Sequence, residues 1–169
     1  NIDHLLPVLK NVRDAGNGAD FTERVKRDYE LDARTLTGDE EARLTFLGAT
    51  AQRKGRESLL VADIGGGSTE LVVGTHGEVR DHVSTQNGVV RHTERHLHHD
   101  PPSRDELDAL ARDVRESLDA VPFNRADAAV AVAGTPTQCA AIDLELERYD
   151  AARVEGHVLT AGRLDAILE

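Results

Sequence analysis

The sequence predicts an α/β protein in which short buried strands alternate with amphipathic helices. Apolar runs bounded by turn residues, at 59–63 and 128–133, are typical of buried strands. Ser103, followed three residues later by Glu106, has the spacing of a capping box at the start of a helix. With 169 residues, of which 39% are apolar, the chain is long enough for one sizeable core or two small lobes.

The first third of the chain is predicted to be mostly helical. A capping-box spacing at Asp20–Glu23 precedes a helix that extends to about residue 30, and the alternating stretch 31–36 is compatible with a short strand. Gly38-Asp39 offers a break and an N-cap for a second helix over 40–51. The polar stretch 52–57 is the best candidate for a linker. The residues expected on the inward face of the second helix are Leu44, Leu47, Gly48 and Ala51.

The rest of the chain predicts two strands joined by a glycine turn, then further helices. The helix that begins after Ser103 is expected to reach Leu118. Gly134-Thr135-Pro136 is expected to supply a turn, an N-cap and a proline at the first helical position. The elements predicted here are strands at 59–63, 69–73 and 128–133, strand-like segments from 75 to 91 with 89–97 compatible with either structure, and helices over 103–118, over 134–146 and after Thr160.

The composition argues against several classes of function. A formal net charge of −11, with basic residues scattered along the chain, argues against nucleic-acid binding. The longest apolar runs are far shorter than the roughly 20 residues of a membrane-spanning helix, so we expect no membrane segment. The single cysteine, Cys139, excludes an internal disulfide, and no secretory pattern opens the chain; both favour the cytoplasm. An anionic ligand would need local backbone amides, arginines and a divalent cation.

The clearest functional signal is the segment Asp63–Glu70, Asp-Ile-Gly-Gly-Gly-Ser-Thr-Glu. Consecutive glycines let backbone amides approach a phosphate without side-chain obstruction. A Walker loop would need a lysine and a following helix, and a dinucleotide fingerprint would need a glycine where Glu70 stands. The pattern therefore predicts a phosphate-binding glycine hairpin whose Asp63 and Glu70 suit a metal-phosphate complex. The alternative is an ordinary tight turn.

Four histidines lie close together at His92, His96, His98 and His99. A zinc site is one interpretation of this group. Because no cysteine or fixed acidic partner accompanies them in the sequence, we interpret the segment as a solvated end before Asp100-Pro101-Pro102. Cys139 is interpreted as a core packing residue.

Two motifs resemble the Ppx/GppA family of exopolyphosphatases and guanosine pentaphosphate phosphohydrolases. The family's glycine loop is intact at 63–70, and Thr37–Arg43 matches its Ser/Thr-Gly-x-Glu-Glu-Ala-Arg segment. The similarity runs from about residue 12 to the C-terminus. Weaker matches are Arg13-Asp14-Ala15, Gly88-Val89-Val90-Arg91, Thr93-Glu94-Arg95, Gly134-Thr135 and the tail from Tyr149 to Thr160.

The resemblance implies a ribonuclease-H-like fold of the actin-like ATPase superfamily, with 1–57 as the end of a first lobe and 58–169 as the start of a second. It implies a phosphohydrolase that releases terminal phosphate from inorganic polyphosphate or guanosine pentaphosphate, without choosing between them, and that uses Mg²⁺ or Mn²⁺. Glu41 would be the general base, while Asp63 and Glu70 would hold the metal and the nucleophile. The implied phosphate-binding residues are Gly65, Gly66, Gly67, Ser68, Arg13, Arg91, Gly134 and Thr135.

Helical spacing supports the role of Glu41 independently. Glu41 lies three residues before Leu44 and seven before Gly48, which predicts that it shares their inward face. A carboxylate there would be partly desolvated, as suits a general base. Glu40 is interpreted as an ordinary first-turn acid that interacts with the helix dipole.

The chain also departs from the family pattern. The family's first phosphate loop, Asp-x-Gly-Thr/Ser-Asn-Ser, has no counterpart, and 7–12 lacks the family's small hydroxyl residues. We therefore expect the chain alone to be inactive, and to expose a sheet edge that favours self-association, for example as a homodimer. Two other functions remain open: an ATP-binding module of the wider superfamily, and a non-catalytic sensor that binds polyphosphate or guanosine pentaphosphate without hydrolysing it.

Overall fold

The computed structural model describes residues 16–31, 36–53, 55–122 and 126–168. The chain divides into two compact units, Asn1–Leu44 and Thr45–Glu169. Described helices of the first unit are α2 (Gly18–Tyr29) and the beginning of α3 (Gly38–Thr50). The second unit contains the end of α3 and then β1 (Leu59–Ile64), β2 (Thr69–Thr75), β3 (Glu78–Thr85), α4 (Val89–His96), α5 (Arg104–Asp119), β4 (Ala128–Val132), α6 (Gly134–Asp143), α7 (Ala151–Val154) and α8 (Ala161–Ile167).

The first helix of the first unit begins earlier than predicted. Asn17 is the N-cap of α2 and makes no side-chain cap bond, while Asp20 lies inside the first turn. The predicted capping box at Asp20–Glu23 is therefore wrong, and Asp20 instead places a negative charge near the positive end of the helix dipole. The strand predicted at 31–36 falls largely outside the described residues.

The α3 helix has the capping box that the sequence analysis missed. The N–H of Glu40 donates to Thr37 Oγ1 at 3.2 Å, and the N–H of Thr37 donates to Glu40 Oε2 at 3.0 Å. Thr37, not Gly38-Asp39, thus supplies the cap. Glu40 is the first-turn acid that the sequence predicts.

The predicted inward face of α3 is wrong. The side chains that are buried recur every four residues, at Ala42, Phe46 and Thr50. Leu44 and Leu47 are exposed. The buried positions are occupied by small, aromatic and hydroxyl residues. The prediction followed the leucines, which lie on the neighbouring face of the helix.

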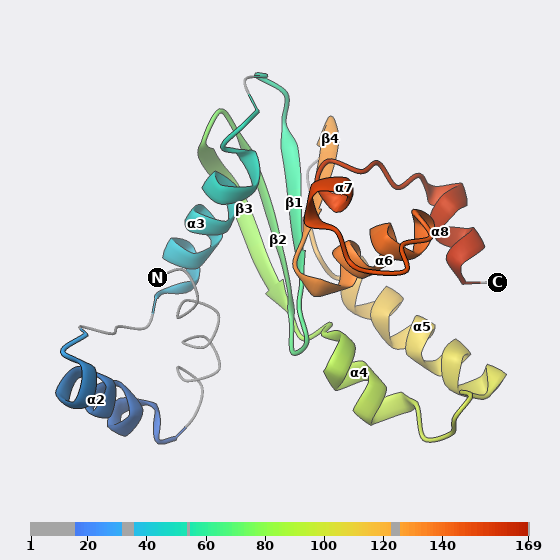
Figure 1. Ribbon diagram of the computed structural model, residues 1–169, viewed down its shortest axis with the longest axis horizontal. Coiled ribbons are helices and arrows are strands. Elements are labelled where there is room, and N and C mark those ends of the chain that lie inside the picture. The colour runs from blue at the N-terminus through green and yellow to red at the C-terminus, as the bar shows by residue number, and fades with distance from the viewer. Residues whose placement is uncertain (1–15, 32–35, 54, 123–125, 169) are drawn as a thin grey trace. The chain divides into compact units, whose positions relative to one another are not determined.

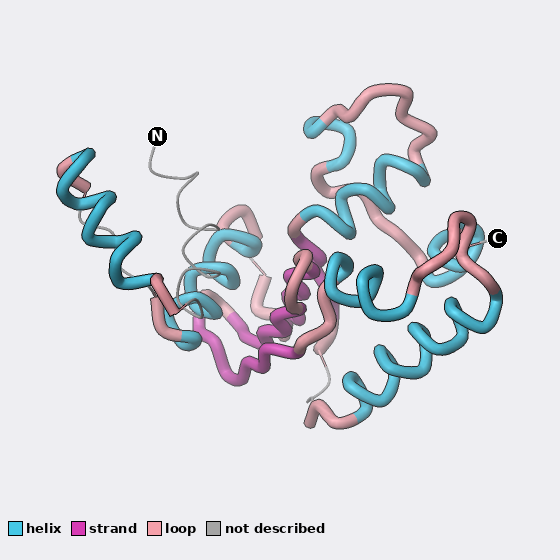
Figure 2. The backbone as a smooth tube through the Cα atoms, turned by 90° about the horizontal axis from the view of Figure 1, so that it is seen from below, coloured by secondary structure: helices cyan, strands magenta, loops and turns pink. Residues whose placement is uncertain are grey.

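The described strands form a four-stranded sheet in the order β3-β2-β1-β4 (Figure 1). Neighbouring strands β1 and β2, and β2 and β3, are antiparallel, whereas β4 runs parallel to β1. Its core includes Val61 and Val72, which lie opposite each other and are fully buried. Helices lie on both sides of this sheet, with α6 in contact with β1 and β4 (Figure 2). The strands predicted at 59–63, 69–73 and 128–133 are all confirmed.

The end of α3 packs on one face of the sheet through Phe46. This side chain is fully buried, and its ring edge approaches Gly74, which lies opposite Leu59 in the hairpin. Residues alternate between the two faces along a strand, so Leu59, Val61 and Asp63 share the face that Phe46 covers. The buried aromatic ring therefore fixes the end of α3 that belongs to the second unit on the face that carries Asp63.

The connections after the sheet confirm some helix signals and correct others. The capping box of α5 forms as predicted, between Ser103 and Glu106. Ala133 is the N-cap of α6, so Thr135 and Pro136 lie inside the helix and the predicted N-cap and first-position proline are wrong. The α8 helix is capped by Thr160 as predicted. In the part of the chain that the structure describes, no helix is both long and apolar enough to cross a membrane.

Replacing Gly74 with alanine should destabilise the second unit. The new Cβ would lie 2.4 Å from the Glu78 carbonyl oxygen and 2.7 Å from Phe46 Cζ, so strand or ring must move. We expect a loss of about 1–3 kcal/mol in the free energy of unfolding, as for other overpacked cores. Urea denaturation would measure it. The matched control is Gly48→Ala, where nothing lies within 4 Å and helix propensity predicts a small gain; equal effects of the two variants would contradict the packing described.

Candidate functional site

The glycine loop joins two antiparallel strands, as the sequence predicts. Ile64 pairs with Thr69, and the N–H of Gly65 donates to the Ser68 carbonyl at 3.0 Å, which closes the turn. The Thr69 hydroxyl donates to the Asn87 carbonyl, and the Thr85 hydroxyl donates to the Thr69 carbonyl at 3.2 Å. These side-chain bonds attach the outgoing strand to the segment that leads into α4.

The N-terminus of α4 binds the carbonyl side of this loop. The N–H of Val89 donates to Gly65 O at 3.0 Å, and the N–H groups of Val90 and Arg91 donate to Gly66 O at 2.9 and 3.1 Å. Arg91 Nε donates to Gly67 O at 2.9 Å. Helix N-termini carry N–H groups without intrahelical partners, so here the loop itself supplies the missing acceptors.

This arrangement orients the loop amides. A trans peptide is planar, and its N–H points opposite to its C=O. Because the carbonyls of Gly65, Gly66 and Gly67 point toward α4, the N–H groups of Gly66, Gly67 and Ser68 point away from it. Successive amides that converge on one side of a turn are a typical anion-binding concavity.

Gly88 makes this contact with α4 possible. A Cβ at Gly88 would lie 2.3 Å from Gly66 O and 2.3 Å from the Gly67 carbonyl carbon, so only glycine allows the two backbones to approach. From the sequence, Asn87-Gly88 is predicted only to separate two strand-like segments. The signal for its role was the glycine directly before a helix, but the loop it contacts lies 21 residues earlier.

Asp63 and Glu70 lie directly opposite each other in the hairpin, on the same face of the sheet and beside the loop. Ser84, opposite Glu70 on the next strand, donates its hydroxyl to Glu70 Oε1 at 2.8 Å. Like charges placed opposite each other destabilise a sheet. Carboxylate oxygens are also the ligands that Mg²⁺ and Mn²⁺ prefer, so this donor set fits the predicted cation.

A second predicted phosphate-binding element lies at the same edge of the sheet. Asp63 pairs with Val132 in the parallel ladder, so β1 and β4 end at the same edge. Gly65 directly follows β1, and Gly134 follows β4 after Ala133. Crevices at the carboxyl ends of neighbouring strands are the usual ligand sites of α/β sheets. Thr135 Oγ1 is buried there without a hydrogen-bond partner. The structure thus brings Gly134 and Thr135 to the edge that carries the glycine loop.

Of the other predicted site residues, Arg91 is bound to the loop through the bond from its Nε to Gly67 O. Glu41 belongs to the first unit, on α3, where it is partly buried and its N–H donates to Thr37 O at 3.0 Å. Leu44 and Gly48, its predicted neighbours on the inward face, are exposed; Glu41 instead lies in line with Thr45 and Ala49. Arg13 lies outside the described residues. The catalytic role of Glu41 and the phosphate contacts of Arg91 stay predictions.

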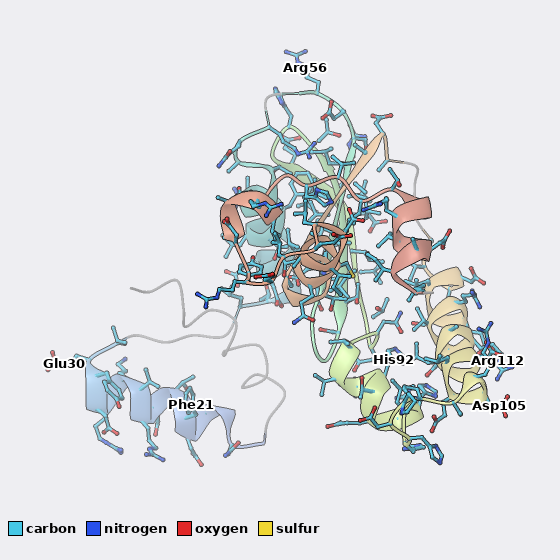
Figure 3. The ribbon with its side chains drawn as sticks, turned by 45° about the vertical axis from the view of Figure 1, so that its right-hand side comes forward. Phe21, Glu30, Arg56, His92, Asp105 and Arg112 are labelled. Carbon is cyan, nitrogen blue, oxygen red and sulfur yellow. The ribbon has the colours of Figure 1, made fainter. Side chains whose placement is uncertain are left out.

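The histidine segment is only partly solvated. His98 and His99 are exposed, as predicted, but His92 is buried on the side of α4 that packs against α5 (Figure 3). Asp113 of α5 accepts a hydrogen bond from His96 Nε2 at 2.8 Å. For His92 and His96 the interpretation as a solvated end is therefore wrong, because the fixed acidic partner comes from a different helix. Cys139 is partly buried on α6.

A glycine hairpin and a parallel strand β4, with helices on both sides of the sheet, define an α/β domain of the actin-like ATPase, ribonuclease-H-like superfamily. The sequence profile of the Ppx/GppA phosphatase family matches residues 10–169, and the chain belongs to this family. A crystal structure of the Aquifex aeolicus family member aligns with 98% of this chain and 60% of its own, at a TM-score of 0.82 and 31% identity.

Other relatives agree with this assignment. An exopolyphosphatase-like protein of known structure covers 92% of this chain and 52% of its own, with a TM-score of 0.82 and 37% identity. Exopolyphosphatase 2 of Mycobacterium tuberculosis is 42% identical over 127 residues, which are 72% of this chain and 40% of that protein. The chain therefore spans 40% to 60% of the length of these relatives.

Gly88→Ala should disconnect α4 from the glycine loop. The backbone angles of Gly88 are φ −118 and ψ 142, which alanine also adopts, so the effect would come from the steric clash alone. We expect a loss of about 1–3 kcal/mol in stability and faster amide hydrogen exchange at Val89 and Val90. Gly162→Ala, in open space on α8, is the control. Unchanged exchange at both valines in Gly88→Ala would contradict the contact.

Proposed function

We propose that this chain contributes the glycine-loop side of the active site of a phosphohydrolase that releases terminal phosphate from polyphosphate-type chains. The observation that carries the proposal is the loop itself. Its Gly66, Gly67 and Ser68 amides point to one side, and the Asp63 and Glu70 carboxylates lie next to it. Amides and carboxylates together suit a metal-bound phosphate chain, because the amides bind oxygen anions and the carboxylates bind the cation.

The reaction would be attack of water on the terminal phosphorus. Glu41 would take the proton from that water, and the loop amides would stabilise the charge that develops on the phosphoryl oxygens. Asp63 and Glu70 would hold Mg²⁺ or Mn²⁺, which would neutralise the charge of the phosphate chain. Ser84 would position Glu70 through its 2.8 Å hydrogen bond.

Inorganic polyphosphate is the substrate that the relatives favour, since those with a named activity are exopolyphosphatases. Guanosine pentaphosphate is the second candidate, because the family name includes it and both molecules end in a phosphoanhydride. We also propose a cytoplasmic location, on the basis of the single cysteine.

Simple binding and phosphate-release measurements distinguish the two other functions from this one. An ATP-binding module would bind adenine nucleotide more tightly than polyphosphate of equal charge. A sensor would bind polyphosphate without releasing phosphate. Phosphate release from polyphosphate, measured with a protein as long as the family relatives, tests the proposed function directly; binding without release would replace it with the sensor.

Glu41→Gln should abolish most of the hydrolysis in that longer protein. Removing a positioned general base typically lowers the rate by about 10²–10⁴-fold, and here kcat should fall while KM changes little. The matched control is Glu40→Gln in the same helical turn, because glutamine still completes the capping box with Thr37. Equal rates for the two variants would show that Glu41 is not the base.

Asp63→Asn should raise the concentration of Mg²⁺ needed for half-maximal activity by at least about tenfold, because an amide oxygen is a weaker ligand than a carboxylate. Asp81→Asn is the control, since Asp81 is exposed on β3. A titration of phosphate release against Mg²⁺ measures the shift. The same half-maximal concentration in Asp63→Asn and in the unchanged protein would remove Asp63 from the metal site.

A further inference from the structure

A cluster of three potential metal ligands lies between α4 and α5, away from the glycine loop. His92, His96 and Asp113 each offer one ligand atom, and these atoms lie within 4.8 Å of one another. His92 and His96 are one helical turn apart on α4, and their rings stack with centroids 5.7 Å apart. Asp113 belongs to α5, so the cluster joins two helices that pack together.

The hydrogen bonds of His92 leave one of its ring nitrogens without a partner. Nε2 lies 3.1 Å from Asn87 Oδ1, and it carries the proton in the tautomer that donates to this acceptor. Nδ1 then presents a lone pair, is buried, and has no hydrogen-bond partner. The carboxylate oxygen Asp113 Oδ2, which is also an acceptor, lies 3.8 Å from Nδ1.

A lone pair that faces a carboxylate inside a protein is unfavourable unless a cation lies between them. A proton on Nδ1 is one such cation, and a divalent metal ion is another. Neutral imidazole is the form of histidine that binds metals. Asn87 fixes the tautomer, as outer-shell partners of metal-bound histidines commonly do.

The spacing of the ligand atoms suits a tetrahedral ion. Bonds of about 2.0–2.2 Å at tetrahedral angles place neighbouring ligand atoms about 3.4 Å apart. Asp113 Oδ2 lies 2.8 Å from His96 Nε2 and 3.8 Å from His92 Nδ1, which bracket this value. The side chain of Asp113 is 34% exposed, so a water molecule can supply the fourth ligand.

The Arg95 guanidinium would compete with a metal ion for Asp113. Asp113 Oδ2 also accepts from Arg95 Nη1 at 2.9 Å. The Arg95 side chain is 53% exposed and can move into water when a metal takes its place. These bonds explain the position of Asp113 and His96 without a metal, but they leave His92 Nδ1 unexplained.

We propose that His92, His96 and Asp113 form a binding site for Zn²⁺ that fastens α4 to α5. The site is separate from the carboxylate pair at Asp63 and Glu70, and it does not depend on the proposed hydrolysis. Its effect would be structural, because α4 carries the two histidine ligands and contacts the glycine loop with its N-terminus.

Zn²⁺ titration of the chain by calorimetry tests the proposal. We expect saturable binding with one ion per chain. His96→Ala and Asp113→Asn should each lower the affinity by at least about 100-fold, because losing a ligand costs more than losing an outer-shell partner, which costs about 10–100-fold. His98→Ala is the matched control, since His98 is an exposed histidine on the same segment, and it should keep the affinity of the unchanged chain.

Two further readouts separate ligand loss from unfolding. Both altered ligands are partly exposed, so circular dichroism should show folded variants. Co²⁺ bound to the unchanged chain should give the intense visible absorption of a four-coordinate ion, and Zn²⁺ should raise the unfolding temperature of this chain but not that of His96→Ala. Absence of one-to-one binding, or unchanged affinity in both ligand variants, would overturn the proposal.

Discussion

The structure of the candidate site depends on the hydrogen bonds between the N-terminus of α4 and the carbonyls of the glycine loop. Three glycines in a row have no preferred conformation, because glycine populates both halves of backbone space about equally. Without an external constraint the loop amides would point in many directions. The bonds from Val89, Val90 and Arg91 select one arrangement, in which the amides needed by an anion point away from the helix.

This constraint assigns α4 a different task from the usual anion-binding helix. Helix N-termini often bind phosphate directly. Here the N-terminal amides of α4 bind the loop carbonyls, so the amides of the loop, and not those of the helix, point away from this contact. The helix acts as a rigid support, and Gly88 permits the close approach on which the support depends. The orientation of the amides is then set in advance, which is what electrostatic stabilisation of phosphoryl transfer requires.

Sequence alone predicted the local features and missed those that depend on distant contacts. The hairpin around Asp63–Glu70 and the capping box of Ser103 follow from turn and capping chemistry within eight residues, and both are confirmed. The inward face of α3 did not follow, since Phe46 is buried by packing against Gly74, which lies in another element. His92 was misjudged for the same reason: its acidic neighbour, Asp113, belongs to a helix that the sequence could not place beside it.

The buried, unpartnered nitrogen of His92 shows how the two ends of α4 are related. An unsatisfied buried polar atom costs about 1–3 kcal/mol, so the fold must hold His92 in place through other interactions. Its Nε2 is bound to the side-chain Oδ1 of Asn87. The backbone carbonyl of Asn87 accepts a hydrogen bond from the Thr69 hydroxyl, at the end of the glycine loop. The ring thus contacts the residue that leads into α4 and, through it, the outgoing strand of the loop. Any cation that binds between His92 and Asp113 would stabilise this same chain of contacts, and the loop conformation with it.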